Sequence, residues 1–380
     1  MDKRILHVVS VSFSLPYFIG EQFTYFRRKT DYTFYVACSP SEELSDLSEE
    51  LQFTKVPLPI NRAISPIQDL KAIFLLRKFI RENKIDIVVG HTPKGGMIAM
   101  LAAYLAGLKN RVYFRHGIMF ETSRGIKRFI LKSIEQMTGF FATKVVCVSN
   151  EIKSISEREH LSNKKKNILL GRGTCNGVDC DNRFNPENYY NERDLKDKLG
   201  LDDTNFVVGY VGRLVKDKGT EDLVNAWSLV TDKYPQARLL LVGPFEDRDA
   251  VSEEVKNKIV DTSSIIHTGL VKNTEDYYAV MDAFILPSYR EGFPTVILEA
   301  SSMGLPILTT RATGCSEAII ENETGIFFDI ESVKIYEAIE YFINNRSIAR
   351  QMGENGRNFV KENFEQSYIW RIIENKILST

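Results

Sequence analysis

Short apolar runs alternate with longer amphipathic stretches through the N-terminal half of the chain. The apolar runs predict buried strands at residues 5–11, 32–38, 54–57, 86–90, 111–115, 144–148 and 166–170. The amphipathic stretches between them predict helices, among them 19–29, 66–83 and 125–138. Buried strands that alternate with helices are typical of a parallel sheet that is covered on both faces.

The same alternation starts again after a polar stretch at residues 186–200. It predicts strands at 206–211, 238–242, 265–268, 283–286, 306–309 and 325–328, and closing helices at 333–344, 348–362 and 368–378. We therefore predict an α/β protein with two doubly wound, Rossmann-like parallel-sheet domains, 1–185 and 186–362, followed by a helical segment at 363–380.

Composition narrows the class of protein. The 380 residues are 43% hydrophobic and 26% charged, which is typical of a globular enzyme, and the net charge of -1 gives no global attraction to nucleic acid. The five cysteines form no C-x-x-C pair, so we expect free thiols in a reducing cytoplasm. Neither a signal peptide nor an apolar run of membrane-spanning length is apparent.

The segment from Ser288 to Ala300 carries the first candidate site. It follows the predicted strand 283–286 and leads into a predicted helix at 296–303, where Pro294 suits the first turn. Gly292 permits close approach of the backbone, and the free amides of a helix start bind anions.

Two carboxylates, Glu291 and Glu299, lie on either side of this helix start. Carboxylates only accept hydrogen bonds, so they suit sugar or ribose hydroxyls, while the backbone amides would hold phosphate. The segment therefore predicts a nucleotide-sugar site. The alternative is an ordinary strand, turn and capped helix with a solvated Glu299.

A second candidate site lies in the Gly-rich, basic turn from Gly209 to Gly219. The predicted strand 206–211 runs into this turn, and ligands of open α/β sheets bind beyond the carboxyl ends of strands. Arg213 can hold a phosphate with its guanidinium fork, and Lys218 can add a point charge. The alternative is a basic surface turn.

Two of the histidines, His91 and His116, each follow a predicted buried strand. His91, Thr92, Lys94 and the Gly95-Gly96 amides could donate hydrogen bonds to phosphate, although a structural role for each histidine is equally consistent with the pattern. The histidines lack metal-ligand spacing, and the carboxylate pairs Asp179/Asp181 and Asp247/Asp249 are close to chance, so we predict no metal site. Neither a G-x-S-x-G elbow nor a complete P-loop is present.

Basic and apolar residues are mixed between positions 111 and 132. The basic ones are Arg111, Arg115, Arg124, Lys127, Arg128 and Lys132, and the apolar ones include Ile118, Met119, Phe120, Phe129, Ile130 and Leu131. A basic, apolar face suits the headgroups of a bilayer or a lipid diphosphate. The alternative is a helix that packs its apolar stripe inward and solvates its lysines.

Three parts of the chain resemble motifs of the retaining glycosyltransferases of family four. They are Gly212-Arg213-Leu214 with Lys218-Gly219, Glu291-Gly292-Phe293-Pro294 with Glu299-Ala300, and Asn176-Gly177-Val178-Asp179. The resemblance spans nearly the whole chain and implies the GT-B fold, in which two domains face each other across a cleft and the last helix crosses back.

Two further stretches resemble motifs of the bacterial branch that builds capsule, O-antigen and lipid-linked oligosaccharides. They are the stretch from His91 to Gly96 and the tripeptide Arg115-His116-Gly117. This branch includes the enzyme that adds N-acetylgalactosamine to undecaprenyl-diphosphate-bacillosamine. One departure is the loop Ser12-Phe13-Ser14-Leu15-Pro16, where many family members have a Gly-Gly turn.

The resemblance implies a role for each matching residue. Arg213 and Lys218 would neutralise the diphosphate, Glu291 and His116 would contact the donor sugar, and these four form the implied catalytic set. Donor binding would also involve Gly212, Leu270, Gly292, Phe293, Pro294, Thr295 and Glu299, the last on the ribose hydroxyls. The acceptor-binding prediction is His91, Thr92 and Lys94.

We therefore expect a retaining, metal-independent glycosyltransferase without a cofactor. It would move a hexose or N-acetylhexosamine from a nucleotide sugar, which we expect to be a UDP sugar, to a lipid-linked glycan. We expect it in the cytoplasm, peripheral on the inner face of the cytoplasmic membrane, without a nucleic-acid partner. The alternatives are a nucleotide-sugar 2-epimerase of similar fold and a non-catalytic nucleotide-sugar-binding assembly subunit.

Overall fold

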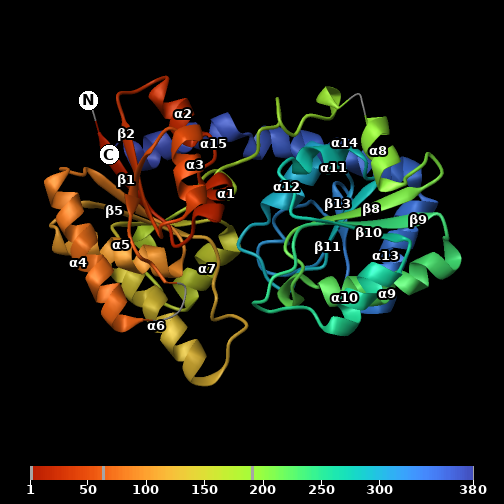
Figure 1. Cartoon of the computed structure of the whole chain (residues 1–380), viewed down its shortest axis with the longest axis horizontal. Helices are drawn as coiled ribbons and strands as arrows, with labels where there is room; N and C mark the ends of the chain where they lie inside the picture. Colours follow the sequence, from red (N-terminus) through yellow and green to blue (C-terminus); the bar gives the residue numbers. More distant parts are fainter. Residues whose placement is uncertain (1–2, 62–64, 190–191, 380) are drawn as a thin grey trace. The chain divides into compact units, whose positions relative to one another are not determined.

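The computed structural model describes residues 3–61, 65–189 and 192–379. The chain forms two compact units (Figure 1). The first comprises Met1–Asn176 together with Tyr368–Thr380, and the second comprises Gly177–Ser367. The first unit thus ends before the polar stretch at which the sequence pattern placed the boundary.

The first unit is built on a seven-stranded, wholly parallel sheet in the order β3-β2-β1-β4-β5-β6-β7. The strands are β1 (Arg4–Val8), β2 (Thr33–Cys38), β3 (Thr54–Pro57), β4 (Ile87–Gly90), β5 (Asn110–Arg115), β6 (Lys144–Cys147) and β7 (Asn167–Ile168). All seven predicted strands are confirmed. The sheet grows in opposite directions from β1 and β4, so its topological switch point lies between these two strands.

The helices that connect the strands of the first unit are η1 (Ser12–Ser14), α1 (Leu15–Phe18), α2 (Gln22–Arg27), α3 (Glu42–Glu50), α4 (Pro66–Glu82), α5 (Pro93–Leu105), α6 (Gly125–Phe141), α7 (Asn150–Arg158) and η2 (Lys164–Lys166). The C-terminal segment, with α15 (Gln366–Ile373) and the π-helical turn η5 (Glu374–Leu378), returns to this unit from Tyr368 onward. The single helix predicted at 19–29 is wrong at its start, because Gly20 adopts a left-handed φ of 51° and separates α1 from α2.

The second unit has a six-stranded parallel sheet in the order β10-β9-β8-β11-β12-β13. Its strands are β8 (Phe206–Val211), β9 (Ala237–Val242), β10 (Ile265–Gly269), β11 (Ala283–Leu286), β12 (Ile307–Thr309) and β13 (Gly325–Phe327). Its helices are η3 (Pro186–Asn188), α8 (Glu192–Leu199), η4 (Lys216–Lys218), α9 (Thr220–Lys233), α10 (Glu253–Asp261), α11 (Thr274–Ala279), α12 (Thr295–Ser302), α13 (Ser332–Asn344) and α14 (Arg346–Phe364). The switch point lies between β8 and β11.

The apolar runs explain why these strands are central. Every residue of β4, β8 and β11 is buried, as expected for strands with helices on both faces. The two sheets share the same strand order around the switch point, so the sequence positions just after β1 and β4, and just after β8 and β11, are where this topology places ligands.

A buried ion pair corrects one sequence prediction. Arg115, at the end of β5, is fully buried, and its Nε lies 2.9 Å from Oε2 of Glu135 in α6. The Tyr113 hydroxyl donates to the other oxygen of Glu135 at 2.9 Å. Arg115 therefore fixes α6 to the sheet and is not part of a basic surface.

Candidate active site

The turn after β8 is shaped by Gly219, which ends η4 and begins α9 with a left-handed φ of 68°. A Cβ at this position would lie 2.0 Å from the carbonyl oxygen of Pro287, just after β11. Glycine is therefore required twice, by the backbone conformation and by the contact. The contact lets the turn from Gly212 to Gly219 lie directly against the end of β11.

Hydrogen bonds fasten this turn to the one that follows β11. The carbonyl of Asp217 accepts from the Tyr289 amide at 3.0 Å and from the Ser288 hydroxyl at 3.2 Å. The side chain of Asp217 pairs with Arg290, with Oδ2 3.0 Å from Nη2. The two predicted motifs, about 70 positions apart in sequence, thus form one site at the switch point.

Each predicted phosphate-binding cation has a carboxylate partner. The Nζ of Lys218 lies 2.5 Å from Oε1 of Glu291, and these side chains are only 17% and 14% exposed. Arg213 forms an ion pair with Glu246 at a more exposed position. A diphosphate would compete for both cations, and Glu291, still close by, would offer an acceptor to a sugar hydroxyl.

The start of α12 completes this site. The helix begins at Thr295, one position earlier than predicted, and Pro294 is its N-cap and not a residue of its first turn. The Ile297 amide donates to the carbonyl of Pro294 at 3.0 Å, and the amides that precede it at the helix start suit an anion. Further along the helix, Glu299 accepts a hydrogen bond from the Tyr278 hydroxyl at 2.9 Å, and burial raises the pKa of this carboxyl.

A second glycine supports the turn that carries Glu291. Gly314 has a left-handed φ of 79°, and a Cβ there would lie 2.4 Å from the carbonyl oxygen of Gly292. The amide of Glu291 also donates to the carbonyl of Thr313 at 2.9 Å. The support that Thr313 and Gly314 give to Glu291 becomes visible only when β11 and β12 are placed side by side.

The remaining donor-site predictions lie around this centre. Gly212 follows β8 directly, and the Phe293 ring contacts Phe364 with centroids 5.3 Å apart. Leu270 lies just beyond the end of the edge strand β10 and is 78% exposed. The sequence pattern assigned no role to Asp217, although it lies within the Gly-rich turn, and it missed Tyr278, which lies outside every motif.

In the first unit, three histidines lie in a row across the ends of β1, β4 and β5. The Nδ1 of His7 is 3.1 Å from the Nε2 of His91, and the Nδ1 of His91 is 2.9 Å from the Nε2 of His116. His91 is 1% exposed, and burial lowers its pKa to about 3. Both of its ring nitrogens are occupied by other histidines, so His91 has no ring nitrogen left to bind the acceptor substrate.

The neighbouring residues predicted to bind acceptor build the first turn of α5. The Thr92 hydroxyl accepts from the Gly95 amide at 3.2 Å and lies 2.8 Å from the Ser10 hydroxyl. Lys94 pairs with Asp69 of α4 at 2.9 Å, and both side chains are largely buried. Gly96 packs its backbone against the Tyr113 ring. These contacts cap and pack α5, so an acceptor phosphate would have to share them.

The carboxylate pairs considered for a metal have other tasks. Asp179 accepts from the amide of Asn182 at 3.0 Å, and Asp249 accepts from the amide of Asp217 at 2.8 Å. Within residues 3–61, 65–189 and 192–379, no group of three or more His, Cys, Asp or Glu side chains is arranged to hold a metal ion.

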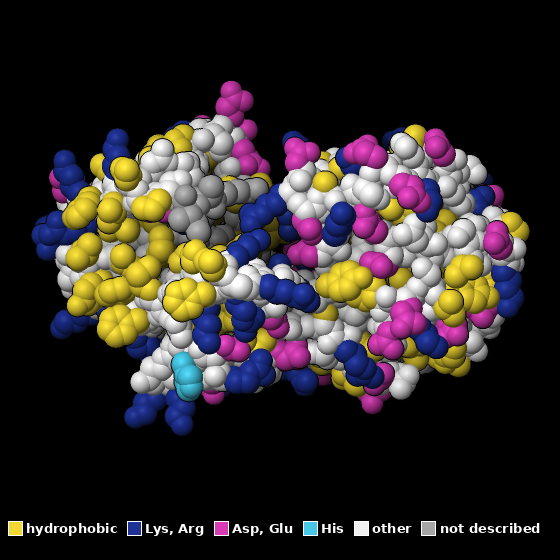
Figure 2. All heavy atoms as spheres, turned by 90° about the horizontal axis from the view of Figure 1, so that it is seen from below, with side chains coloured by type: hydrophobic (Ala, Val, Ile, Leu, Met, Phe, Trp, Pro, Cys, Tyr) yellow, Lys and Arg dark blue, Asp and Glu magenta, His cyan; other side chains and the backbone are white. Residues whose placement is uncertain are grey.

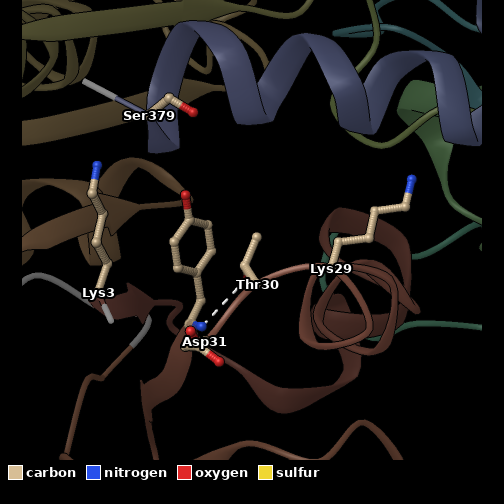
Figure 3. Close-up of a pocket in the computed structure, with 6 residues that line it drawn as sticks. Lys3, Lys29, Thr30, Asp31 and Ser379 are labelled. Carbon is tan, nitrogen blue, oxygen red and sulfur yellow. Dashed lines mark hydrogen bonds between the residues drawn. The ribbon is translucent and has the colours of Figure 1, made fainter. Parts of the chain in front are cut away.

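A hollow in the first unit lies elsewhere (Figure 3). It is lined by Lys3, Lys29, Thr30, Asp31, Tyr32 and Ser379. Lys3 and Tyr32 immediately precede β1 and β2, so the hollow is at the amino ends of these strands. Ligands of such sheets bind at the opposite, carboxyl edge, which is where the histidine row lies.

Comparison with known proteins agrees with this geometry. Residues 25–173 match the family described as Glycosyltransferase Family 4, and residues 191–359 match Glycosyl transferases group 1. The chain is 31% identical over 374 residues to the capsular polysaccharide biosynthesis glycosyltransferase CapM of Staphylococcus aureus, which covers 98% of this chain and 96% of CapM. It is 24% identical over 327 residues to the N,N'-diacetylbacillosaminyl-diphospho-undecaprenol alpha-1,3-N-acetylgalactosaminyltransferase of Campylobacter jejuni, with 83% of each chain covered.

Among solved structures, the chain is similar to Anabaena Alr3699/HepE in complex with UDP-glucose. The TM-score is 0.82 at 19% identity, and 99% of this chain and 100% of that one are covered. This likeness supports the predicted fold of two Rossmann-like parallel-sheet domains. The near-complete similarity to the capsular glycosyltransferase, together with both domain matches, shows that the chain belongs to the family 4 glycosyltransferases with the GT-B fold, in the bacterial branch that builds surface polysaccharides.

Proposed function

We propose that this enzyme transfers a hexose or N-acetylhexosamine from a UDP sugar to a lipid-linked glycan, with retention of the anomeric configuration and without a metal. The observation that carries the proposal is that the turn with Arg213 and Lys218 is fastened, through the carbonyl of Asp217, to the turn that carries Glu291 and leads into the helix of Glu299. The relatives support the donor and acceptor classes. One similar structure holds UDP-glucose, and the Campylobacter relative is named for a diphospho-undecaprenol substrate.

The chemistry of the proposed step needs little from the protein beyond charge and position. The acceptor hydroxyl bonds to the anomeric carbon as the bond from that carbon to the diphosphate breaks, and the hydroxyl proton passes to the departing phosphate oxygen. Lys218 and Arg213 stabilise the negative charge that develops on the diphosphate, and the first-turn amides of α12 add to this effect. Glu299 holds the ribose, while Glu291 contacts the donor sugar and orients it.

Nucleotide release from a panel of UDP, GDP and ADP sugars tests this function. The assay would contain a purified undecaprenyl-diphosphate-linked sugar, with and without a chelator. We expect release from one UDP sugar, stimulated by the lipid, unchanged by the chelator and lost in Lys218→Ala and Glu291→Ala. The anomeric configuration of the isolated product then decides retention.

The two alternatives fail differently in the same assay. An epimerase would convert the sugar without a lipid acceptor, and the named relatives favour transfer over epimerisation. A non-catalytic binding subunit would bind UDP but release no nucleotide from any donor. Binding without turnover across the panel would therefore contradict the proposed function.

We also propose that the first unit docks on the membrane through α6. In this helix Glu135, Thr138 and Gly139 are the buried residues, whereas Ile126 and Phe129 are 79% and 72% exposed. The helix thus turns apolar side chains outward, contrary to the alternative in which they pack inward. No helix in the described part of the chain is long and apolar enough to cross a membrane.

The apolar surface extends beyond α6 onto its neighbours α5 and α4. Its further exposed members are Ile67, Leu70, Phe74, Leu75, Tyr104, Leu105, Ile130 and Phe140. Figure 2 shows hydrophobic side chains gathered over this face, with Lys and Arg side chains at its margin. Arg124 and Lys127 are exposed next to the α6 stripe, whereas Arg128 and Lys132 are paired with Glu159. Such a surface suits an anionic bilayer.

Sedimentation with anionic phospholipid vesicles tests the docking. We expect salt-sensitive binding that falls at least tenfold in the variant Ile126→Ser/Phe129→Ser. Val260→Ser, which removes a 77% exposed apolar side chain from α10 of the second unit, is the matched control. Vesicle binding that is equal in all three proteins would contradict docking through α6.

A further inference from the structure

The histidine row of the first unit has one end that is closed and one that is open. His7 lies 3% exposed at the end of β1, and its Nε2 has no hydrogen-bond partner. His116, after β5, is partly exposed, and within the described residues its Nδ1 has no hydrogen-bond partner. Of the three histidines, His116 is therefore the one that can meet a ligand from solvent.

The direction of the two hydrogen bonds follows from the closed end. A neutral imidazole carries one N–H, so each N–H···N bond fixes which nitrogen of the next ring accepts. If the bonds ran toward His7, its buried Nε2 would carry an N–H without an acceptor, which is the costlier kind of unsatisfied group. If they run toward His116, His7 leaves only an unpaired lone pair at Nε2.

The surroundings favour the neutral state of the whole row. Aromatic rings pack around it: Phe23 contacts His7 at 5.0 Å between centroids, Phe114 contacts His91 at 5.0 Å, and Phe18 stacks on His116 at 3.7 Å. Burial lowers the pKa of all three histidines, and no charged side chain other than the histidines themselves contributes to these shifts.

We propose that His7 and His91 are positioning residues that hold His116 in its neutral Nδ1–H tautomer, so that the enzyme presents a fixed, uncharged hydrogen-bond donor at the carboxyl end of β5. In this arrangement His7 donates from Nδ1 to His91, and His91 donates from Nδ1 to His116. An uncharged N–H suits a sugar hydroxyl oxygen, and this assignment of a ligand rests on the proposed function.

The unusual loop after β1 contributes to the same device. The residues from Ser12 to Pro16 form η1 and the start of α1, and α1 ends at Phe18. The Phe18 ring lies nearly parallel to the His116 ring, with an interplanar angle of 14°. Phe18 therefore limits rotation of the imidazole while His91 fixes its protonated nitrogen.

Nitrogen-15 spectra of the full-length chain with labelled histidine test the proposal directly. The chain has only five histidines, so each imidazole can be assigned by single substitution. We expect His7, His91 and His116 to be neutral with protonated Nδ1 at pH 6, a pH at which free imidazole in water is largely charged. A signal from His116 or His91 with protonated Nε2, or a charged His116, would overturn the proposal.

Two variants of His91 separate positioning from packing. His91→Phe keeps a ring in the stack but removes the donor to His116, so we expect an averaged tautomer signal at His116 and a kcat at least tenfold lower with little change in the donor KM. His91→Asn can still donate from Nδ2 and should restore the Nδ1–H signal and most of kcat. If His91→Phe leaves the His116 signal and kcat unchanged, the row is structural only.

The spectra also keep this proposal distinct from the proposed function, because they need neither donor nor acceptor. A row in the expected tautomer without glycosyl transfer would contradict only the function. Active enzyme with protonated Nε2 at His116 would contradict only the row.

Discussion

The two switch points of this molecule share one strand order but carry opposite chemistry. At the switch point of the second unit, charged side chains such as Lys218 and Glu291 are paired and in part reach solvent. At that of the first unit, His7, His91 and His116 are neutral, stacked and mostly buried. The topology determines where side chains converge, while the loops and strand ends determine which chemistry converges there.

The difference also shows how each region is held. The charged site depends on backbone contacts between turns, where the second unit needs glycine at Gly219 and Gly314. The histidine row depends on hydrogen bonds between side chains from three different strand ends. Backbone changes should therefore damage the charged site most, and side-chain changes should damage the row most.

The largest expected effect comes from Gly219→Ala, with Gly200→Ala as its matched control. The two glycines have nearly equal φ angles of 68° and 67°, but a Cβ at Gly200 would have no neighbour within 4 Å. Left-handed strain costs about 1–2 kcal/mol in either variant. The overlap with Pro287 adds about 1–3 kcal/mol in Gly219→Ala alone.

Urea unfolding followed by the fluorescence of Trp227, a buried residue of α9, measures this difference. Trp370 is the only other tryptophan, so a Trp370→Phe background isolates the signal. Equal losses of unfolding free energy in the two glycine variants would show that the backbone contact does not hold the charged site together.

The next largest effect is expected from Lys218→Met on UDP binding. A charge-assisted hydrogen bond contributes about 1.5–3 kcal/mol, so its loss should weaken binding by roughly 10–150-fold. The exposed Lys216→Met, two residues away in η4, changes net charge equally and should reduce affinity less than threefold. Calorimetric titration with UDP measures both. Equal losses of UDP affinity in the two variants would mean that the turn attracts UDP only through its net positive charge.

The sequence predicted the charged site far better than the row. The glycines, Arg213, Lys218 and both glutamates lie in short, contiguous motifs, and the strand pattern placed both motifs at carboxyl ends. The motifs did not reveal the carboxylate partners of the cations or the Tyr278 donor. Those contacts join positions that are 21 to 73 residues apart.

The histidine row could not be predicted, because it depends on strand order. His7 and His91 are 84 positions apart and meet only because β1 pairs with β4. The pattern marked His7 as a strand residue and left a structural role for His91 and His116 open. A predicted strand order with histidines at three neighbouring strand ends would have been the available signal.

A smaller effect is expected in the pH dependence of stability when His7 is replaced by Phe. Because the pKa of His7 is far lower in the folded chain, the unfolded chain binds more protons below pH 6.5, and stability is lost as the pH falls. One such histidine accounts for about 1.4 kcal/mol between pH 7.5 and 5.5. Between pH 7.5 and 5.5, the free energy of unfolding of His7→Phe should therefore fall by that much less than the free energy of unfolding of the wild type.

Unfolding by urea at the two pH values, followed by the fluorescence of Trp370 in the first unit, measures the slope. His160→Asn, which removes an exposed histidine of the same unit, is the control. An unchanged slope in His7→Phe would mean that His7 already binds a proton in the folded chain, against a neutral row.

The smallest effect is expected from Tyr278→Phe, which removes the hydroxyl that donates to Glu299. The bond acts on UDP only by positioning the Glu299 carboxylate, so we expect its loss to cost about 1 kcal/mol of binding and to weaken UDP binding about fivefold. Burial already raises the pKa of Glu299, and loss of this donor should raise it further, so the deficit should grow as the pH falls from 7.5 to 5.5. Tyr277→Phe, its neighbour in α11, is the control. If Glu299 holds the ribose, the difference in affinity between Tyr278→Phe and wild type should be smaller for 2′-deoxy-UDP than for UDP. An equal loss of affinity for both nucleotides would place Glu299 away from the 2′-hydroxyl.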